Sequence, residues 1–221
     1  MKILAINGSP RKKHNTAVLL NHALEGAASA GAQTEIAHLY DFEYKGCISC
    51  FACKVKNCKE PGICLYKDAL RPLLEKALAA DALVLGSPVY FESVTGMMRS
   101  FMERLLFPAL EYTEGYKSIL KRKIPTGFIY TMNVPESYME TSGYRGALAF
   151  GEADIARLLG YCEWMAANDT VQFDDYSKYV CTVFDEAHKK QVKSEQFPKD
   201  CSKAFAMGEH LVKKAREAVG S

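Results

Sequence analysis

The sequence lacks the long apolar runs and the one-sided charge that mark several classes of protein. No apolar stretch approaches the ~18 residues that a helix needs to cross a bilayer. The net charge is only +2, so there is no electrostatic footprint for nucleic acid or for an anionic membrane. We therefore expect neither nucleic acid nor a membrane among the main partners.

The first ten residues also lack the features of a secretory leader. They hold a short apolar stretch but no h-region and no small-residue cleavage site. We therefore expect a cytoplasmic protein. In that reducing compartment, clustered cysteines indicate a metal or redox site rather than a framework of disulfides.

Strand and helix patterns alternate along the 221 residues, of which 48% are hydrophobic. Strands are expected at 2–7, 33–40, 82–86 and 124–131, with a fifth within 161–172, and helices at 15–30, 68–80, 94–106, 147–159 and 204–218. Such alternation predicts a parallel sheet with helices on both faces. We expect one domain over 1–221, with a cysteine-rich loop at 45–67 and a C-terminal extension at about 173–221, where 173–198 is a peripheral loop or helix.

The first expected strand ends in a Gly-Ser-Pro turn that leads into a helix. Ligands bind at the carboxyl ends of strands in open α/β sheets, and a helix N-terminus can hold phosphate. Ser9, Arg11, Asn15 and Thr16 supply polar donors there. The turn matches neither G-x-G-x-x-G nor G-x-x-x-x-G-K-[ST]. Helix capping by Asn15 or Thr16 is the alternative interpretation.

A second Gly-Ser-Pro follows the third expected strand, at 86–88. Tyr90 and Phe91 come directly after it, and a loop with backbone amides and two aromatic rings suits a flat heteroaromatic ligand. A simple turn between strand and helix, with two core aromatics, is the alternative.

Together, KILAINGSPRKKHNT and LVLGSPVYFESVTGMMRSFMERL resemble the flavodoxin-like family of NAD(P)H-dependent FMN reductases, and the resemblance extends from Met1 to about residue 160. It implies a doubly wound five-stranded parallel sheet of order 2-1-3-4-5, with FMN at the switch point between the first and third strands. It places the phosphate on the first loop, the isoalloxazine on the second and a further contact after the fourth strand. The implied flavin-binding residues are Ser9, Arg11, Asn15, Thr16, Ser87, Pro88, Val89, Tyr90, Phe91, Thr131 and Asn133.

Five of the eight cysteines lie within 18 residues. Cys47, Cys50 and Cys53 form C-x2-C-x2-C, with Cys58 and then Cys64 beyond them, and three thiolates at this spacing can surround one iron–sulfur cluster. The motif resembles that of the iron–sulfur flavoproteins, a branch of the same family, which carry a [4Fe–4S] cluster beside FMN. The expected ligands are Cys47, Cys50, Cys53 and Cys58, with Cys64 as the alternative fourth ligand, and zinc or free thiols as alternatives to the cluster.

These patterns and the resemblance predict a flavin-dependent oxidoreductase. Its expected role is electron transport between FMN and a [4Fe–4S] cluster, with no catalytic side chain. The expected partners are NAD(P)H or another small electron donor, a ferredoxin-type redox partner, and further copies of the chain in a dimer or a dimer of dimers. The alternatives are a cluster-free NAD(P)H-dependent FMN or quinone reductase and a non-catalytic zinc-binding or thiol-sensing module.

Overall fold

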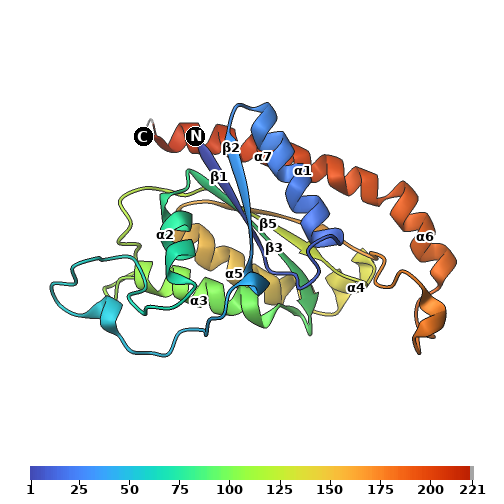
Figure 1. Cartoon of the computed structure of the whole chain (residues 1–221), viewed down its shortest axis with the longest axis horizontal. Coiled ribbons are helices and arrows are strands. Elements are labelled where there is room, and N and C mark those ends of the chain that lie inside the picture. Colours follow the sequence, from blue (N-terminus) through green and yellow to red (C-terminus); the bar gives the residue numbers. More distant parts are fainter. Residues whose placement is uncertain (220–221) are drawn as a thin grey trace.

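The computed structural model describes residues 1–219, and its centre is a parallel sheet. The five parallel strands are β1 (Lys2–Asn7), β2 (Gln33–His38), β3 (Ala82–Tyr90), β5 (Thr126–Thr131) and β6 (Cys162–Ala167), in the order β2-β1-β3-β5-β6 (Figure 1). The two-residue β4 (Ser93–Val94) pairs antiparallel with the end of β3. Counting only the parallel strands, this is the expected order 2-1-3-4-5, and the predicted fold class is confirmed.

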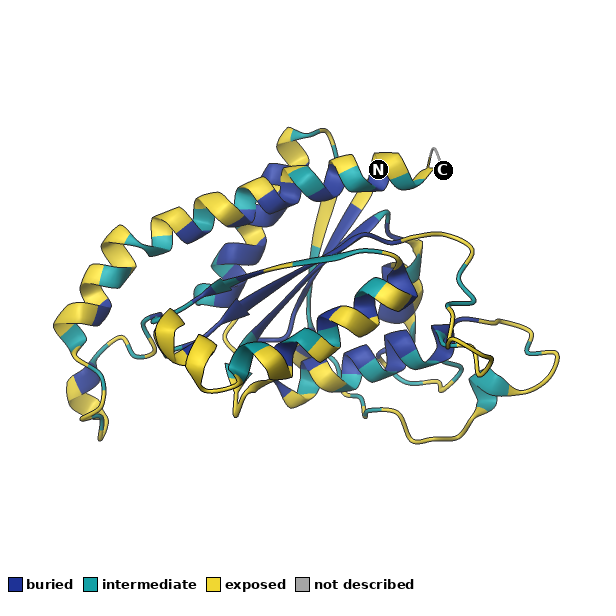
Figure 2. Ribbon diagram, turned by 180° about the vertical axis from the view of Figure 1, so that it is seen from behind, coloured by how far each residue is buried: buried dark blue, intermediate teal, exposed yellow. Residues whose placement is uncertain are grey.

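Helices cover both faces of the sheet. α2 (Arg71–Ala79), α3 (Gly96–Ala109) and α5 (Tyr144–Leu159) pack on one face, and α1 (Asn15–Ser29) and α7 (Phe197–Val219) pack on the other. α4 (Glu136–Thr141) and α6 (Glu186–Glu195) carry few buried residues. Figure 2 shows the buried strands between the two helix layers, whose outer surfaces are exposed.

The alternation of side chains along β1 explains why both faces must be covered. Leu4 and Ile6 join the core under α2, α3 and α5, whereas Ile3 and Ala5 join the core under α1 and α7. A strand that is apolar on both sides is typical of a parallel sheet with two helix layers. The continuous apolar run ILAI therefore fits a central strand.

α1 and α7 meet almost backbone to backbone. A Cβ atom at Gly26 would lie 2.0 Å from the carbonyl oxygen of Phe205, and one at Gly208 would lie 1.8 Å from that of Ala23. Glycine is therefore required at both positions. The helix predicted over 204–218 begins earlier, at Phe197, and its Leu211 is fully buried in the core.

The second Gly-Ser-Pro is part of a strand, so the turn predicted at 86–88 is wrong. β3 continues through these residues to Tyr90, and Ser87 and Pro88 pair with β5. β1 ends opposite Gly86 and β4 pairs only with Val89 and Tyr90, so Pro88 pairs with β5 alone. Proline has no N–H to donate, and it is tolerated where a strand lies at an edge.

The least periodic part of the chain is partly helical. The segment 173–198 contains a short 3₁₀ helix at Tyr176–Lys178, then α6 and the start of α7, in keeping with the prediction of a peripheral loop or helix. The sequence pattern predicts no helix at α4, which lies in a polar stretch with one buried residue, Met139. Within residues 1–219, no helix is both long and apolar enough to cross a membrane.

Candidate cofactor site

A cleft opens beyond the carboxyl ends of the central strands, with an inner volume of about 120 Å³. It is lined by Ser9, Arg11, His14, Asn15, Thr16, Pro88, Val89, Tyr90, Thr131, Met132, Asn133, Thr170, Val171 and Gln172. The structure thus brings together every predicted flavin-binding residue except Ser87 and Phe91. These residues come from three separate parts of the sequence, and the parallel sheet unites them because its strands end at one edge.

The first loop leaves the N-terminus of α1 open toward the cleft. His14 is the N-cap residue and makes no side-chain hydrogen bond to the helix. The alternative that Asn15 or Thr16 caps the helix is therefore wrong. Thr16 shares a hydrogen bond of 2.7 Å with the hydroxyl of Thr131, and Ser9 Oγ accepts from the backbone N–H of Arg11 at 3.1 Å. An uncapped helix N-terminus carries free N–H groups and partial positive charge, which suit an anion.

Thr95, which the sequence did not single out, ties the two loops together. Its hydroxyl donates to the carbonyl oxygen of Gly8 at 2.8 Å and accepts from the N–H of Met98 at 3.2 Å, as the N-cap of α3. Its own N–H donates to Ser87 Oγ at 3.0 Å. Ser87 is fully buried, so it supports the floor of the cleft instead of lining it.

The turn between β3 and β4 exposes an aromatic ring under backbone strain. Phe91 and Glu92 both have positive φ values, 50° and 59°, which are uncommon for residues other than glycine. The Phe91 side chain is 94% exposed, whereas Tyr90, at the cleft, is 46% exposed. Strained residues often gather at ligand clamps, but Phe91 is exposed to solvent and does not line the cleft.

A fourth wall, residues 170–172, follows β6 and was not predicted. Val171 accepts a hydrogen bond of 2.9 Å from the Asn15 amide, and the Gln172 carbonyl accepts one of 2.6 Å from Arg11. The Gln172 side chain accepts from the Asn133 amide at 2.6 Å. The rule that ligands bind beyond strand ends applies to the last strand too, and it could have indicated this segment.

Asn133 presents an unused acceptor in the cleft wall. Its Oδ1 atom is buried and accepts no hydrogen bond from the described residues 1–219. Buried polar atoms are nearly always paired, so an unpaired one needs an explanation. A bound ligand with an N–H or O–H group at this wall would supply the missing donor.

The cysteine loop (residues 45–67) lies at the end of α3, away from the cleft. Cys47, Cys50, Cys53 and Cys64 line one small enclosed pocket, whereas Cys58 does not line it. No group of three metal-ligating side chains within residues 1–219 has the arrangement that holds a metal ion. Burial raises the pKa of the Cys53 thiol, although the charge of Lys54 opposes that rise.

Arg104, from α3, fastens this loop. Its side chain is almost fully buried and donates to Cys64 Sγ at 3.4 Å and to the carbonyl oxygens of Lys45 at 3.3 Å and Tyr66 at 3.0 Å. It also forms an ion pair with Asp68, with one contact of 3.0 Å. One guanidinium therefore joins both ends of the loop to the same helix.

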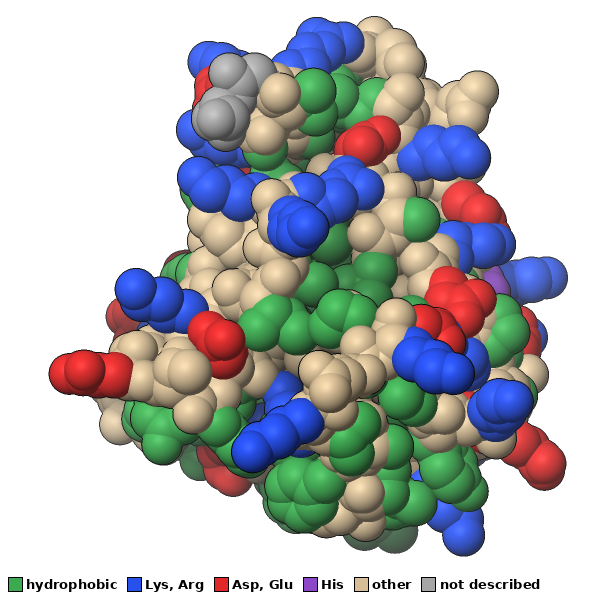
Figure 3. Space-filling model, turned by 90° about the vertical axis from the view of Figure 1, so that its left-hand side faces the viewer, with side chains coloured by type: hydrophobic (Ala, Val, Ile, Leu, Met, Phe, Trp, Pro, Cys, Tyr) green, Lys and Arg blue, Asp and Glu red, His purple; other side chains and the backbone are tan. Residues whose placement is uncertain are grey.

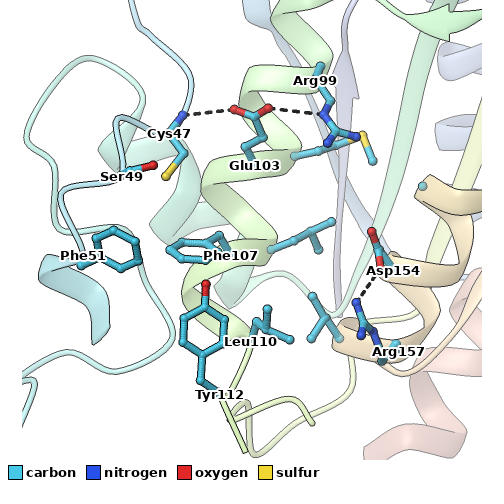
Figure 4. Close-up of a pocket in the computed structure, with 14 residues that line it drawn as sticks. Cys47, Ser49, Phe51, Arg99, Glu103, Phe107, Leu110, Tyr112, Asp154 and Arg157 are labelled. Atoms are coloured by element: carbon cyan, nitrogen blue, oxygen red, sulfur yellow. Dashed lines mark hydrogen bonds and ion pairs between the residues drawn. The ribbon is translucent and has the colours of Figure 1, made fainter. Parts of the chain in front are cut away.

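A second pocket, of about 340 Å³, separates the cysteine loop from α5. Figure 4 shows the side chain of Cys47 above the aromatic rings of Phe51 and Phe107, whose centroids are 6.0 Å apart. Glu103 accepts from the N–H of Cys47 at 3.2 Å and from Arg99 at 3.3 Å. The wall of this pocket is thus apolar, with paired charges at its edge.

The end of the molecule that carries the cysteine loop mixes apolar and charged groups. Ile48, Phe51 and Val55 are each about half exposed on this loop. Figure 3 shows hydrophobic side chains among lysine, arginine and acidic side chains on this end. The loop therefore presents apolar groups close to its cysteines.

An open parallel sheet with a cleft at its switch point, bordered by an uncapped helix N-terminus, defines a flavodoxin-like α/β protein. The sequence pattern of NADPH-dependent FMN reductases matches residues 1–126, which is more than half of the chain. The chain belongs to this family, in its iron–sulfur flavoprotein branch.

Two relatives support the branch. An iron–sulfur flavoprotein of Archaeoglobus fulgidus is 43% identical over 104 residues, which are 47% of this chain and 48% of that protein. A second one from the same organism is 30% identical over 165 residues, or 73% of this chain and 69% of that protein. The chain thus spans about half the length of the first of these relatives.

Among solved structures, an NAD(P)H:quinone oxidoreductase from Methanothermobacter marburgensis shares the fold, with a TM-score of 0.70 and 16% identity. The match covers 96% of this chain and 98% of that one. At this identity the likeness concerns the fold, and it agrees with the strand order described above.

Proposed function

We propose that the protein is an FMN-dependent oxidoreductase that moves electrons between FMN in the cleft and an iron–sulfur cluster held by the cysteine loop. The observation that carries the proposal is the cleft itself. Residues predicted from three distant stretches of sequence line one cavity beside an uncapped helix N-terminus. Membership in the FMN reductase family supports flavin as the ligand.

The chain's own groups suit FMN at both ends of the cleft. The N-terminus of α1, with Ser9 and Thr16, would hold the phosphate, and Arg11 adds a positive charge nearby. The β3 residues Val89 and Tyr90 would lie against the ring. Asn133 Oδ1 would accept a hydrogen bond from a flavin N–H or O–H, which would pair its buried oxygen. When bound, FMN supplies chemistry that links two-electron and one-electron transfer.

The cysteine loop would hold a [4Fe–4S] cluster through thiolates, the ligand type such clusters use. Cys47, Cys50 and Cys53 are the first three proposed ligands. The lining of the enclosed pocket supports Cys64 over the initially expected Cys58 as the fourth. The hydrogen bond from Arg104 to Cys64 would stabilise negative charge on that sulfur.

The electron donor would be NAD(P)H or another small reductant, in line with the family. A ferredoxin-type partner, a homo-oligomer and a cytoplasmic location remain predictions. A cluster-free NAD(P)H-dependent FMN or quinone reductase is the second candidate. Membership in the family of NADPH-dependent FMN reductases supports it as well.

The decisive experiment is the cofactor content of protein purified without oxygen. Near four iron, four sulfide and one FMN per chain would support the proposed function, as the cluster type requires. FMN without iron would select the cluster-free reductase. Zinc without flavin would select the metal-binding or thiol-sensing module and overturn the proposal.

Two matched cysteine variants locate the cluster. Cys50→Ala should remove iron and sulfide but keep FMN, whereas Cys181→Ala, which lies far outside the cysteine loop, should keep both. Comparing Cys58→Ala with Cys64→Ala identifies the fourth ligand, and we expect only the second to lose iron. Iron retained in Cys50→Ala would refute the proposed ligand set.

A further inference from the structure

Lys189 is a buried charge on an otherwise exposed helix. It is the only buried residue of α6, and its side chain is 1% exposed. Burying an ammonium group costs several kcal/mol unless it is paired and hydrogen-bonded. An apolar side chain would pack there without that cost. The reason for a lysine at this position must therefore lie in the partners of its charge.

One of those partners, Asn133, belongs to the wall of the cleft, and another, Asp169, directly precedes the wall segment 170–172. The ammonium group donates to the carbonyl oxygen of Asn133 at 2.6 Å and forms an ion pair with Asp169. It also lies 4.5 Å from the centre of the Phe184 ring. One charge thus joins the loop after β5 to the segment after β6.

Asp169 is itself held in an unusual conformation. Its φ is 56°, in the left-handed region, and its N–H donates to the carbonyl oxygen of Val134 at 2.8 Å. Burial alone would raise the pKa of its carboxyl, but the hydrogen bonds from Lys189 and His188 lower that pKa below its usual value. The carboxylate is therefore a fixed partner for the lysine.

Fixing these two segments fixes the unpaired oxygen of Asn133. The Asn133 amide group donates to Gln172, three residues beyond Asp169, while its backbone carbonyl is held by Lys189. The side chain is therefore anchored on two sides, and only Oδ1 is left without a partner among residues 1–219. Asn133 lines the cleft, so this buried oxygen belongs to the cleft wall.

We propose that Lys189 is a positioning residue of the flavin site, which acts through Asn133 and lies outside the family pattern at 1–126. The inference rests on the proposed function, because it takes flavin as the ligand that donates to Asn133 Oδ1. Without the Lys189 ammonium group, Asn133 loses the donor to its backbone carbonyl and the acceptor loses its fixed orientation, although the hydrogen bond from the Asp169 N–H to Val134 remains. α6, which lies beside the carboxyl end of the sheet (Figure 1), then stabilises the wall of the cofactor site through Lys189.

The test is a double-mutant cycle on FMN affinity, measured on the full chain by quenching of flavin fluorescence. Lys189→Met should raise the FMN dissociation constant by about tenfold or more. In an Asn133→Ala background the same change should add less than about twofold, because the two residues act as one unit. The inference would be overturned if the double variant showed the product of the two single effects on the FMN dissociation constant. It would also be overturned if folded Lys189→Met bound FMN with unchanged affinity.

Three further variants separate positioning from general stability. Lys189→Arg keeps a donor and should restore most of the affinity, and Lys190→Met, on the exposed neighbour, should bind FMN as the wild type does. If Lys189→Met does not fold, Asp169→Asn decides, since it unties the same pair. The inference is supported if Asp169→Asn weakens FMN binding in the wild-type background but not in the Asn133→Ala background. Unchanged FMN binding in Asp169→Asn refutes it. Wild-type protein that binds no FMN would instead refute the proposed function.

Discussion

The flavin cleft and the cysteine loop are built by different means. The cleft lies where regular strands end, and its walls are tied by hydrogen bonds such as those of Thr95 and Thr16. The cysteine loop contains only one short 3₁₀ helix, at Ala52–Lys54, and it has left-handed backbone at Ser49 and Phe51. The geometry of the cleft follows from the sheet, whereas that of the loop depends on a few side chains. One substitution should therefore disorder the loop and spare the cleft.

The largest expected effect is that of Arg104→Met. It would leave Asp68 and two backbone carbonyl groups without their buried partner. Breaking a buried ion pair costs about 3–5 kcal/mol. We expect this loss in urea unfolding, together with faster hydrogen exchange over 45–67 and unchanged exchange in β1.

The control is Arg99→Met, which removes an exposed pair with Glu103 on the same helix. It should change the free energy of unfolding by less than about 1 kcal/mol. If hydrogen exchange in the loop is the same in Arg104→Met and in the wild type, Arg104 does not organise the loop and the contrast fails.

Gly208→Leu tests whether the cleft depends on the packing of α7 against α1. The new side chain cannot fit against Ala23, so α7 must move from α1, whose N-terminus borders the cleft. Overpacking of this kind costs about 1–3 kcal/mol, occasionally more. Thermal unfolding should show the loss, and FMN should bind more weakly. Gly146→Ala, with no atom within 4 Å of its Cβ, should keep both properties.

Ser9→Glu tests the anion end of the cleft with a smaller expected effect. It places a carboxylate where the phosphate is proposed to lie, so the FMN dissociation constant should rise by about tenfold. Ser202→Glu, on the exposed side of α7, is the matched control. Iron content should be unaffected in both variants. Equal flavin affinity in Ser9→Glu and the wild type would contradict the phosphate assignment.

The smallest effect concerns the reactivity of a cysteine in the sheet compared with cysteines in the cysteine loop. Burial raises the pKa of Cys162, in β6, from 9.0 to about 12. At pH 9 the folded protein should keep this thiol neutral and resistant to iodoacetamide, while the exposed Cys47 and Cys50 react when no cluster is bound. Mass spectrometry after alkylation measures this, and equal labelling of Cys162 and Cys50 would contradict it.

The same group has a consequence for stability. The unfolded chain releases the Cys162 proton near pH 9, whereas the folded chain retains it up to about pH 12. The unfolded state therefore binds fewer protons in that range, and the free energy of unfolding should fall as the pH rises above about 9. Cys162→Ala should remove this part of the pH dependence.

Sequence patterns predicted the sheet better than the residues that complete the site. β1 was predicted to the residue, because an apolar run closed by a turn has few alternatives. The turn predicted at 86–88 was wrong, because whether a Gly-Ser-Pro ends a strand depends on where the neighbouring strand stops. Lys189 and the segment 170–172 gave no local signal, because their roles arise from contacts across long stretches of chain. Likewise, spacing alone could not show that Cys64, and not Cys58, lines the enclosed pocket.

The contact between α1 and α7 sets a lower limit on the folding unit. A fragment that ended at residue 126, where the family pattern stops, would contain β1, β3 and α1 but not the helix that covers much of their second face. Buried side chains such as Leu20 and Val84 would border an exposed apolar surface, which invites aggregation. The part of the chain that the family pattern covers is therefore smaller than the part that folds without an exposed apolar face.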